Sequence, residues 1–241
     1  MSLILMTIMG INGIPIPYSP KADDGITILL LCCFFLSAYV LSRSRKFLFQ
    51  LVKDFLFNRE RTSIFATSTA SDMRYLLLLI LQTCVLLGIC IFRCSIDIFP
   101  GLTSFASPYI LVGAYIGICL VYLFLKWLIY SFLGWIFFDG SRVSQWLESY
   151  STLLYYLGFA LFPYVLLLIY FDLNVQLALI IGLFLFVLVK ISMFYKWLKL
   201  FCNNLYGSFL LILYFCALEM LPFLILYRVL EQFNDCLTIK I

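Results

Sequence analysis

Long uninterrupted apolar runs constrain this chain more than any other feature of its sequence. A helix needs about 20 mostly apolar residues to cross the roughly 30 Å hydrocarbon core of a bilayer. Six runs of suitable length occur, at residues 25–41, 75–92, 109–138, 152–171, 175–189 and 205–227. They lack the alternating pattern of a transmembrane β-barrel strand, and helices satisfy their own backbone groups in lipid. The sequence therefore predicts an all-α integral membrane protein with about six transmembrane helices.

The composition indicates the same environment. Of the 241 residues, 65% are hydrophobic, 19% are aromatic and 12% are charged. A soluble domain holds about 25% charged residues, which help to cover its surface, and a disordered chain is poor in aromatic residues. Histidine and the glycine-rich phosphate loop of nucleotide-binding proteins are both absent. We therefore expect no metal site, no cofactor, no nucleic-acid partner and no enzymatic activity.

Basic residues are shared unevenly between the connections. Twelve of the sixteen Lys and Arg residues fall in the segments 42–74, 126–150 and 190–204. Because Lys and Arg accumulate on the cytoplasmic side of a membrane, we expect these three segments to lie in the cytoplasm. Six spans then place both termini on the outer side. The expected organisation is an outer tail at 1–24, a single membrane domain at 25–227 and an outer tail at 228–241.

The stretch after the first span is amphipathic. Between residues 43 and 65, apolar side chains recur at helical spacing, and basic side chains occupy the other face or the ends. This pattern is typical of a helix that lies in the plane of an anionic leaflet. We predict a cytoplasmic interfacial helix whose candidate lipid-contact residues are Arg43, Arg45, Lys46 and Lys53. Such a helix either anchors the chain and sets its topology, or senses lipid and offers a docking face.

Glu219 is the clearest polar residue inside a predicted span. It precedes Tyr227, the expected outer end of the last span, by eight residues, and so lies about 12 Å below that end. Pro222 cannot donate a hydrogen bond to the carbonyl of Leu218, so a free carbonyl and a kink are expected beside the carboxylate. Ionisable residues in lipid are costly and mark pairs or functional sites. Glu219 is therefore either a proton, cation or amine site, or a buried, protonated carboxyl group that bonds across helices to Gln82, a Tyr or an Asn.

Depth along the helices decides which partner we expect for Glu219. Lys126 lies 17 residues, about 26 Å, from the outer start of its helix, where its side chain reaches the inner surface. Lys190 is expected to do the same. Gln82 lies nearer the middle of the membrane and is the predicted contact. Pro163 in the fourth span marks a second kink. The candidate intramembrane polar site is therefore Glu219, Pro222, Gln82 and Pro163.

Three further features leave alternatives open. The run 109–138, which starts after a Ser107-Pro108 pair typical of a helix start, would be about 45 Å long as one helix. It therefore either tilts or leaves the membrane near Lys126. Gly113 and Gly117 have a spacing that lets two membrane helices pack closely. Cys94 and Cys236 fall on the expected outer side and would pair in an oxidising compartment.

Two stretches resemble known families. The run FLLILYFCALEMLPFLILYRVL, with its Leu-Glu-Met-Leu-Pro core, resembles an uncharacterised multi-pass inner-membrane family of Bacteroidota, known as a domain of unknown function, over about residues 25–230. Residues 109–172 resemble the bacterial Yip1-like pattern through Gly140, Trp146, Gly158, Phe159 and Pro163. The resemblances imply a bacterial inner membrane, with both termini in the periplasm, and imply no reaction.

The sequence leaves more than one function open. The first hypothesis is a non-enzymatic scaffold or accessory for an envelope process, which acts with an envelope membrane protein or a second copy of the chain. The alternative is a small transporter or lipid-handling protein that uses Glu219 at a proline-kinked helix. A lipid-modifying enzyme is a third class, with Asp97, Asp139 and Asp172 as its acids, but the chain has little acid–base equipment for it.

Overall fold

The structure is a computed structural model. It describes residues 19–57, 70–99, 102, 107–137, 140–171, 173, 175–201 and 205–238. A short 3₁₀ turn, η1 (Pro20–Ala22), precedes six helices: α2 (Asp24–Phe57), α3 (Ala70–Ile98), α5 (Pro108–Phe137), α6 (Gly140–Tyr170), α7 (Val175–Phe201) and α8 (Leu205–Thr238). All regular structure in these ranges is helical, which confirms the predicted all-α class. Most of the expected tail at 1–24 lies outside the described residues.

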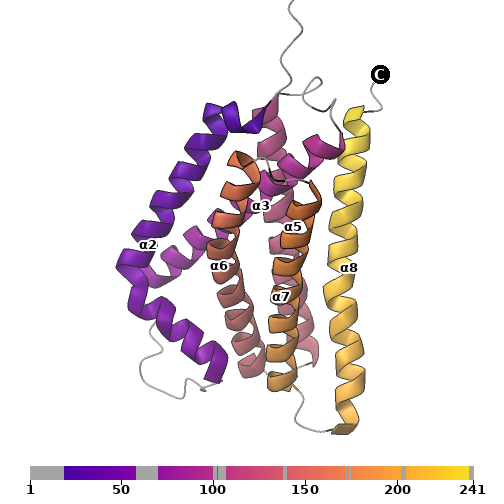
Figure 1. Cartoon of the computed structure of the whole chain (residues 1–241). Coiled ribbons are helices and arrows are strands. Elements are labelled where there is room, and N and C mark those ends of the chain that lie inside the picture. The colour runs from indigo at the N-terminus through magenta and orange to yellow at the C-terminus, as the bar shows by residue number, and fades with distance from the viewer. Residues whose placement is uncertain are drawn as a thin grey trace, which may run out of the picture.

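The helices run alternately up and down, with α3 crossing the bundle obliquely (Figure 1). α3 packs against α2, α5 and α6, and α6 packs against α7 as well. α2 and α8 lie at opposite edges of the bundle, and α8 packs against α5 and α7. The beginning of α2 and the end of α8 lie at the same end of the bundle, which we call the N/C end.

Five of the described helices are long and apolar enough to cross a membrane. The candidate spans are Asp24–Lys46, Arg74–Ile98, Pro108–Phe132, Trp146–Tyr170 and Gln176–Lys199. They correspond to the first five predicted spans. The sixth, at 205–227, falls within α8, but the side chains of residues 205–216 lie outside the described part of the chain. The long third run is one continuous helix without a break at Lys126.

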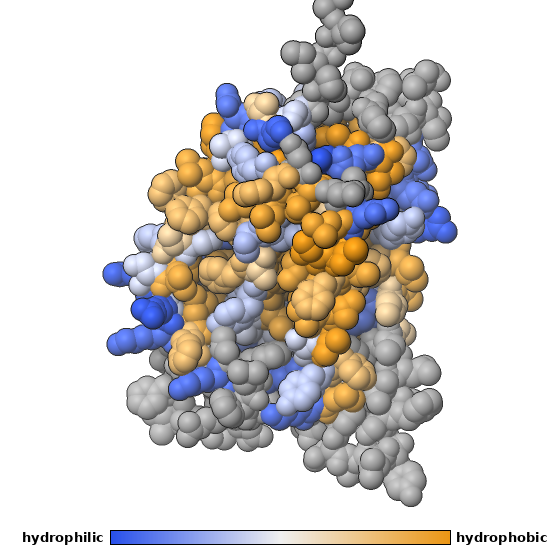
Figure 2. Space-filling model, viewed as in Figure 1, coloured by the Kyte–Doolittle hydropathy of each residue, from blue (hydrophilic) through white to orange (hydrophobic). Residues whose placement is uncertain are grey.

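Surface hydropathy agrees with this assignment. Apolar residues spread across the middle of the face shown in Figure 2, and hydrophilic residues lie toward its margins. Only 11% of the candidate span in α7 is buried inside the bundle, against 50% of that in α6. α7 therefore presents most of its apolar side chains to the surroundings, which suits a lipid solvent.

α2 combines a span with a second limb. Its backbone leaves helical geometry at Ser44, where φ is −116° and ψ is 19°, and Figure 1 shows the helix changing direction. The second limb ends at Phe57, and residues 58–65 of the predicted interfacial helix lie outside the described residues; its position at a membrane surface stays a prediction. The Tyr156 hydroxyl donates a 2.7 Å hydrogen bond to the carbonyl of Leu48, which ties this limb to α6.

A glycine in α6 permits its close approach to α3. A Cβ atom added at Gly158 would lie 2.4 Å from Oγ1 of Thr83. Thr83 donates to the carbonyls of Leu79, at 2.8 Å, and Leu154, at 3.2 Å, and is fully buried. By contrast, nothing among the described residues lies within 4 Å of a Cβ added at Gly113 or Gly117. The described residues therefore do not show the predicted use of those two glycines in packing.

The structure also bears on the possible disulfide between two cysteines. Cys94 and Cys236 are both free thiols in the structure. The open possibility of a disulfide between them is therefore not realised.

Candidate functional site

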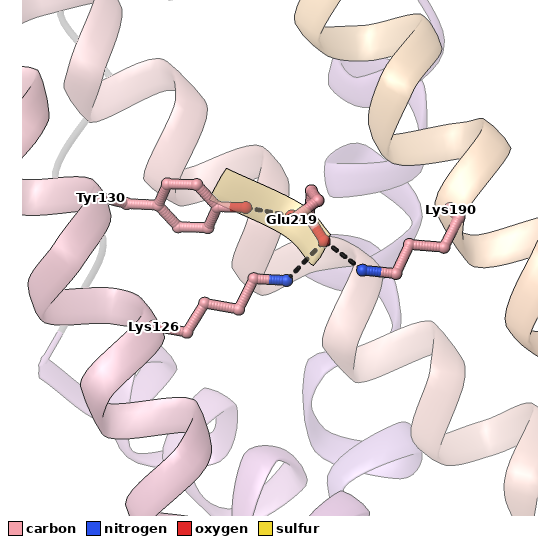
Figure 3. Close-up of polar contacts among 4 residues, drawn as sticks. All are labelled: Lys126, Tyr130, Lys190 and Glu219. Atoms are coloured by element: carbon pink, nitrogen blue, oxygen red, sulfur yellow. Dashed lines mark hydrogen bonds and ion pairs between the residues drawn. The ribbon is translucent and has the colours of Figure 1, made fainter. Parts of the chain in front are cut away.

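Three helices bring ionisable side chains together inside the bundle. Lys126 and Tyr130 lie one turn apart on α5, Lys190 lies on α7 and Glu219 lies on α8. Figure 3 shows Lys126 and Tyr130 reaching Glu219 from one side and Lys190 reaching it from the other. We call these four residues the charge cluster. Its members are separated by up to 93 positions in the sequence, so the fold assembles it from distant parts of the chain.

Both oxygens of the Glu219 carboxylate accept hydrogen bonds. Nζ of Lys126 donates to Oε2 at 2.7 Å, and Nζ of Lys190 donates to the same oxygen. The Tyr130 hydroxyl donates to Oε1. Two ammonium groups therefore share one carboxylate oxygen. With all three ionisable groups charged, the cluster carries a net charge of +1.

The members differ in their exposure. The side chains of Lys126 and Glu219 are 3% and 6% exposed, whereas that of Lys190 is 24% exposed. The pair of Lys126 with Glu219 is therefore held away from solvent, where an ion pair is stable only with good geometry and further hydrogen bonds. Of these three side chains, that of Lys190 is the most accessible from outside the bundle.

Aromatic rings enclose the Lys126 ammonium. Its Nζ lies 6.0 Å from the ring centroid of Tyr122, 5.6 Å from that of Tyr130 and 5.2 Å from that of Tyr150. The Tyr130 ring also packs edge to face against Tyr150 and Trp146 of α6, with centroids 5.3 and 5.6 Å apart. Each ring face attracts a cation by about 0.5–2 kcal/mol. The tyrosines therefore stabilise Lys126 in its charged form.

The length of α8 explains why the sequence predicted a different partner for Glu219. The apolar run ends at Tyr227, but the helix continues to Thr238. Glu219 therefore lies 19 residues, about 28 Å, from the N/C end. Lys126 lies 18 residues, about 27 Å, from Pro108 at the start of α5. The two side chains are level, and the predicted exclusion of Lys126 is wrong.

The other predicted members of the site lie elsewhere or contribute differently. Nε2 of Gln82 donates to Oγ of Ser37 on α2 at 2.6 Å, so its predicted contact with Glu219 is wrong. Pro222 is buried one turn after Glu219, and α8 continues through it as one helix. Pro163 is an exposed residue within α6. The structure therefore keeps Glu219 and Pro222 together and separates them from Gln82 and Pro163.

A tyrosine was among the expected partners of Glu219, but Tyr130 was not singled out, and the role of Lys190 was not expected. Tyr130 follows Lys126 by four residues, and side chains at that spacing lie on one face of a helix. This signal was present in the sequence. Lys190 carries no comparable signal, because its position beside Glu219 depends on how α7 and α8 pack.

The predicted lipid-contact residues lie at and beyond the bend of α2. Arg43, Arg45, Lys46 and Lys53 are all exposed. Nζ of Lys53 lies 5.3 Å from the ring centroid of Phe49, whose side chain is also exposed. The geometry places a basic, partly aromatic surface next to the bend, and contact with lipid headgroups stays a prediction.

No group of three or more His, Cys, Asp and Glu side chains that could hold a metal ion occurs among the residues the structure describes. The carboxylate, the two ammonium groups and the phenol of the charge cluster suit proton transfer and the binding of charged groups.

A comparison with curated proteins and one with solved structures found no match. A family model described as a domain of unknown function (DUF4271) matches residues 26–230. This range contains the charge cluster and most of the described helices, and it confirms the expected membership of a family of unknown function. The chain belongs to the DUF4271 family.

Proposed function

We propose that the chain is a small, non-enzymatic transport or lipid-handling protein of a bacterial inner membrane, and that the charge cluster is its working site. The observation that carries this proposal is the meeting of Lys126, Lys190 and Glu219 from three helices. Ionisable residues inside membrane bundles are expensive and commonly mark the path of an ion or substrate. Because apolar side chains of similar size often stabilise a core as well as a buried ion pair does, stability alone does not account for three ionisable groups at this place.

The contacts of α8 support a mechanism for coupling. Glu219 ties the middle of this helix to α5 and α7. Nearer the N/C end, the Tyr115 hydroxyl of α5 donates a 2.6 Å hydrogen bond to Oδ1 of Asn234. Neutralising Glu219, or drawing away one of its lysines, would release the middle of α8 while Asn234 still holds its end. A change in the charge of the cluster would thereby move the middle of α8 relative to α5 and α7.

A second proposal rests on the completeness of the same contacts. Both carboxylate oxygens of Glu219 have donors within the chain. A cluster of this kind also serves as a permanent link between helices. In that case the protein is an accessory or scaffold of an envelope process that acts through a membrane-protein partner or a second copy. The basic loops favour the same orientation for both proposals, with the termini in the periplasm.

Complementation of a deletion strain tests the first proposal. Glu219→Gln keeps the size of the side chain and removes its charge, whereas Glu231→Gln changes an exposed carboxylate of the same helix that pairs with Arg228. We expect the Glu219 variant to fail and the Glu231 variant to succeed, at equal levels of folded protein.

Full complementation by folded Glu219→Gln would refute the cluster as a working site. Purification in mild detergent then tests the second proposal. Recovery of a stoichiometric envelope partner or of a homo-oligomer supports an accessory role, and recovery of the monomer alone contradicts it.

A further inference from the structure

The charge cluster holds one more positive charge than negative charge. Within the described part of the chain, the charged side chains found to act on Lys126 and on Glu219 are the other members of the cluster. The phenol groups around Lys126, contributed by Tyr122 and Tyr130 of α5 and Tyr150 of α6, are uncharged at neutral pH. Cys84 of α3 and Cys119 of α5 pack in the same core region. An unbalanced charge is costly where water is excluded, so a monoanion would complete the cluster.

The geometry shows where such an anion would enter. Lys190 is the exposed lysine, at 24%, and its Nζ lies 5.4 Å from the ring centroid of Phe186. The Phe186 ring in turn packs 5.1 Å from that of Phe223 on α8. The approach to Lys190 therefore lies beside the seam between α7 and α8, among aromatic side chains.

The face of α7 on this approach is apolar. Leu179, Leu183, Phe186 and Val187 precede Lys190 by about one to three turns, lie on the same face at that spacing and are exposed at 57%, 63%, 39% and 43%. From Leu179 to Lys190 the helix rises about 16 Å, a length comparable to that of an acyl chain lying along it. A soluble anion gains nothing from such a surface, whereas the tail of an amphiphile does.

We propose that the charge cluster binds the anionic head of a membrane amphiphile, a carboxylate or a phosphate, beside Lys190, with the tail along the exposed face of α7. This inference rests on the proposed function and names its class of substrate. The head accepts hydrogen bonds from the lysine ammonium and makes the whole cluster neutral. Charge-assisted hydrogen bonds of this kind are strong where the local dielectric constant is low.

A binding assay with the full chain in an uncharged detergent tests the proposal. Radiolabelled dodecanoate is the probe in a scintillation proximity measurement. Dodecyl phosphate, dodecanol and sodium chloride are the competitors. The variants are Lys190→Met, Glu219→Gln and the control Lys199→Met, which alters an exposed lysine nine residues further along α7.

We expect saturable binding of one dodecanoate to the wild-type protein. Lys190→Met should weaken it by roughly tenfold or more, because one charge-assisted hydrogen bond is lost. Glu219→Gln should tighten it by a similar factor, a gain that unfolding cannot produce. Lys199→Met should bind as wild type, and dodecanol should not compete. Stronger competition by dodecyl phosphate than by unlabelled dodecanoate would assign the head to a phospholipid, and the reverse would assign it to a fatty acid.

Three results would overturn the proposal: no saturable binding to the wild-type protein, equal affinity in the wild type and folded Lys190→Met, or complete displacement by 0.1 M chloride, on the order of physiological ionic strength. The last would identify a site for small anions. The same variants distinguish failure of the proposed function from failure of the binding proposal. If Glu219→Gln complements the deletion strain while Lys190→Met abolishes binding, the function is refuted and the amphiphile remains as a structural lipid.

Discussion

The charge balance of the cluster predicts that replacing its ionisable members one at a time changes the free energy of unfolding by very different amounts. Glu219→Leu takes away the only negative charge and leaves two ammonium groups that had shared one oxygen. Two hydrogen bonds to one atom place these nitrogens within about 5 Å of each other, where an effective dielectric constant of about 20 gives a repulsion of about 3 kcal/mol. Removal of one partner from a buried ion pair costs about 3–5 kcal/mol by itself. We expect a loss of at least about 3–5 kcal/mol in the free energy of unfolding.

Lys190→Met should behave in the opposite way. It leaves the pair of Lys126 and Glu219 neutral as a whole, with Tyr130 still donating to the carboxylate. Its expected cost is below about 1 kcal/mol, because a partly exposed ion pair contributes little. The triple variant with Met at both lysine positions and Leu at Glu219 should recover most of the stability lost in Glu219→Leu, since an apolar replacement of a whole buried ion cluster is often neutral or stabilising.

Thermal unfolding followed by intrinsic tryptophan fluorescence measures these differences. For a chain of this size, 1 kcal/mol shifts Tm by about 2–4 °C, so Glu219→Leu should lower Tm by roughly 6–20 °C. Glu231→Leu, on the exposed part of the same helix, should change Tm by less than about 4 °C. The reasoning fails if Lys190→Met lowers Tm as much as Glu219→Leu does, or if the triple variant is no better than Glu219→Leu.

Three other changes test separate parts of the fold. Gly158→Ala should lower the free energy of unfolding by about 1–3 kcal/mol, because its Cβ would lie 2.4 Å from a threonine hydroxyl of α3. Gly113→Ala faces open space among the described residues and should be neutral or stabilising. Melting curves compare the two variants. Tyr115→Phe should cost about 1–2 kcal/mol by removing a buried 2.6 Å hydrogen bond to α8, measured in the same way. In a background without other cysteines, Lys53→Cys should react with a membrane-impermeant thiol reagent only after the cells are opened, and Ser107→Cys should react in intact cells. The opposite labelling pattern would overturn the predicted orientation.

The helices themselves were largely predictable because their signals are local. The Ser107-Pro108 pair marks the start of α5, and the apolar run behind it is long enough to predict the helix as a unit. Helix ends were less predictable, because hydropathy reports which residues suit lipid and not where the backbone stops being helical. α8 shows this: polar residues after Tyr227 continue the helix to Thr238, and Asn234 packs inside against Tyr115.

The candidate site was predictable only in part. A carboxylate in an apolar span identified Glu219 as the centre. Its partners could not be chosen, because an error of eleven residues in the end of α8 placed Glu219 about 16 Å too shallow. That error made Gln82 look closer than Lys126. Gly113 and Gly117 show the reverse problem, a sequence motif without the contact it predicts. The motif is present, but none of the described residues packs on it.

The division of charges among the helices has a consequence for how the protein is made. Both lysines belong to helices synthesised before α8, and their shared counter-charge arrives only with Glu219. A chain that is interrupted after α7 would hold both lysines without the carboxylate that they share, and it would be less stable than either the finished protein or a version lacking all three groups. The last helix therefore supplies the counter-charge that both lysines share and also completes the bundle.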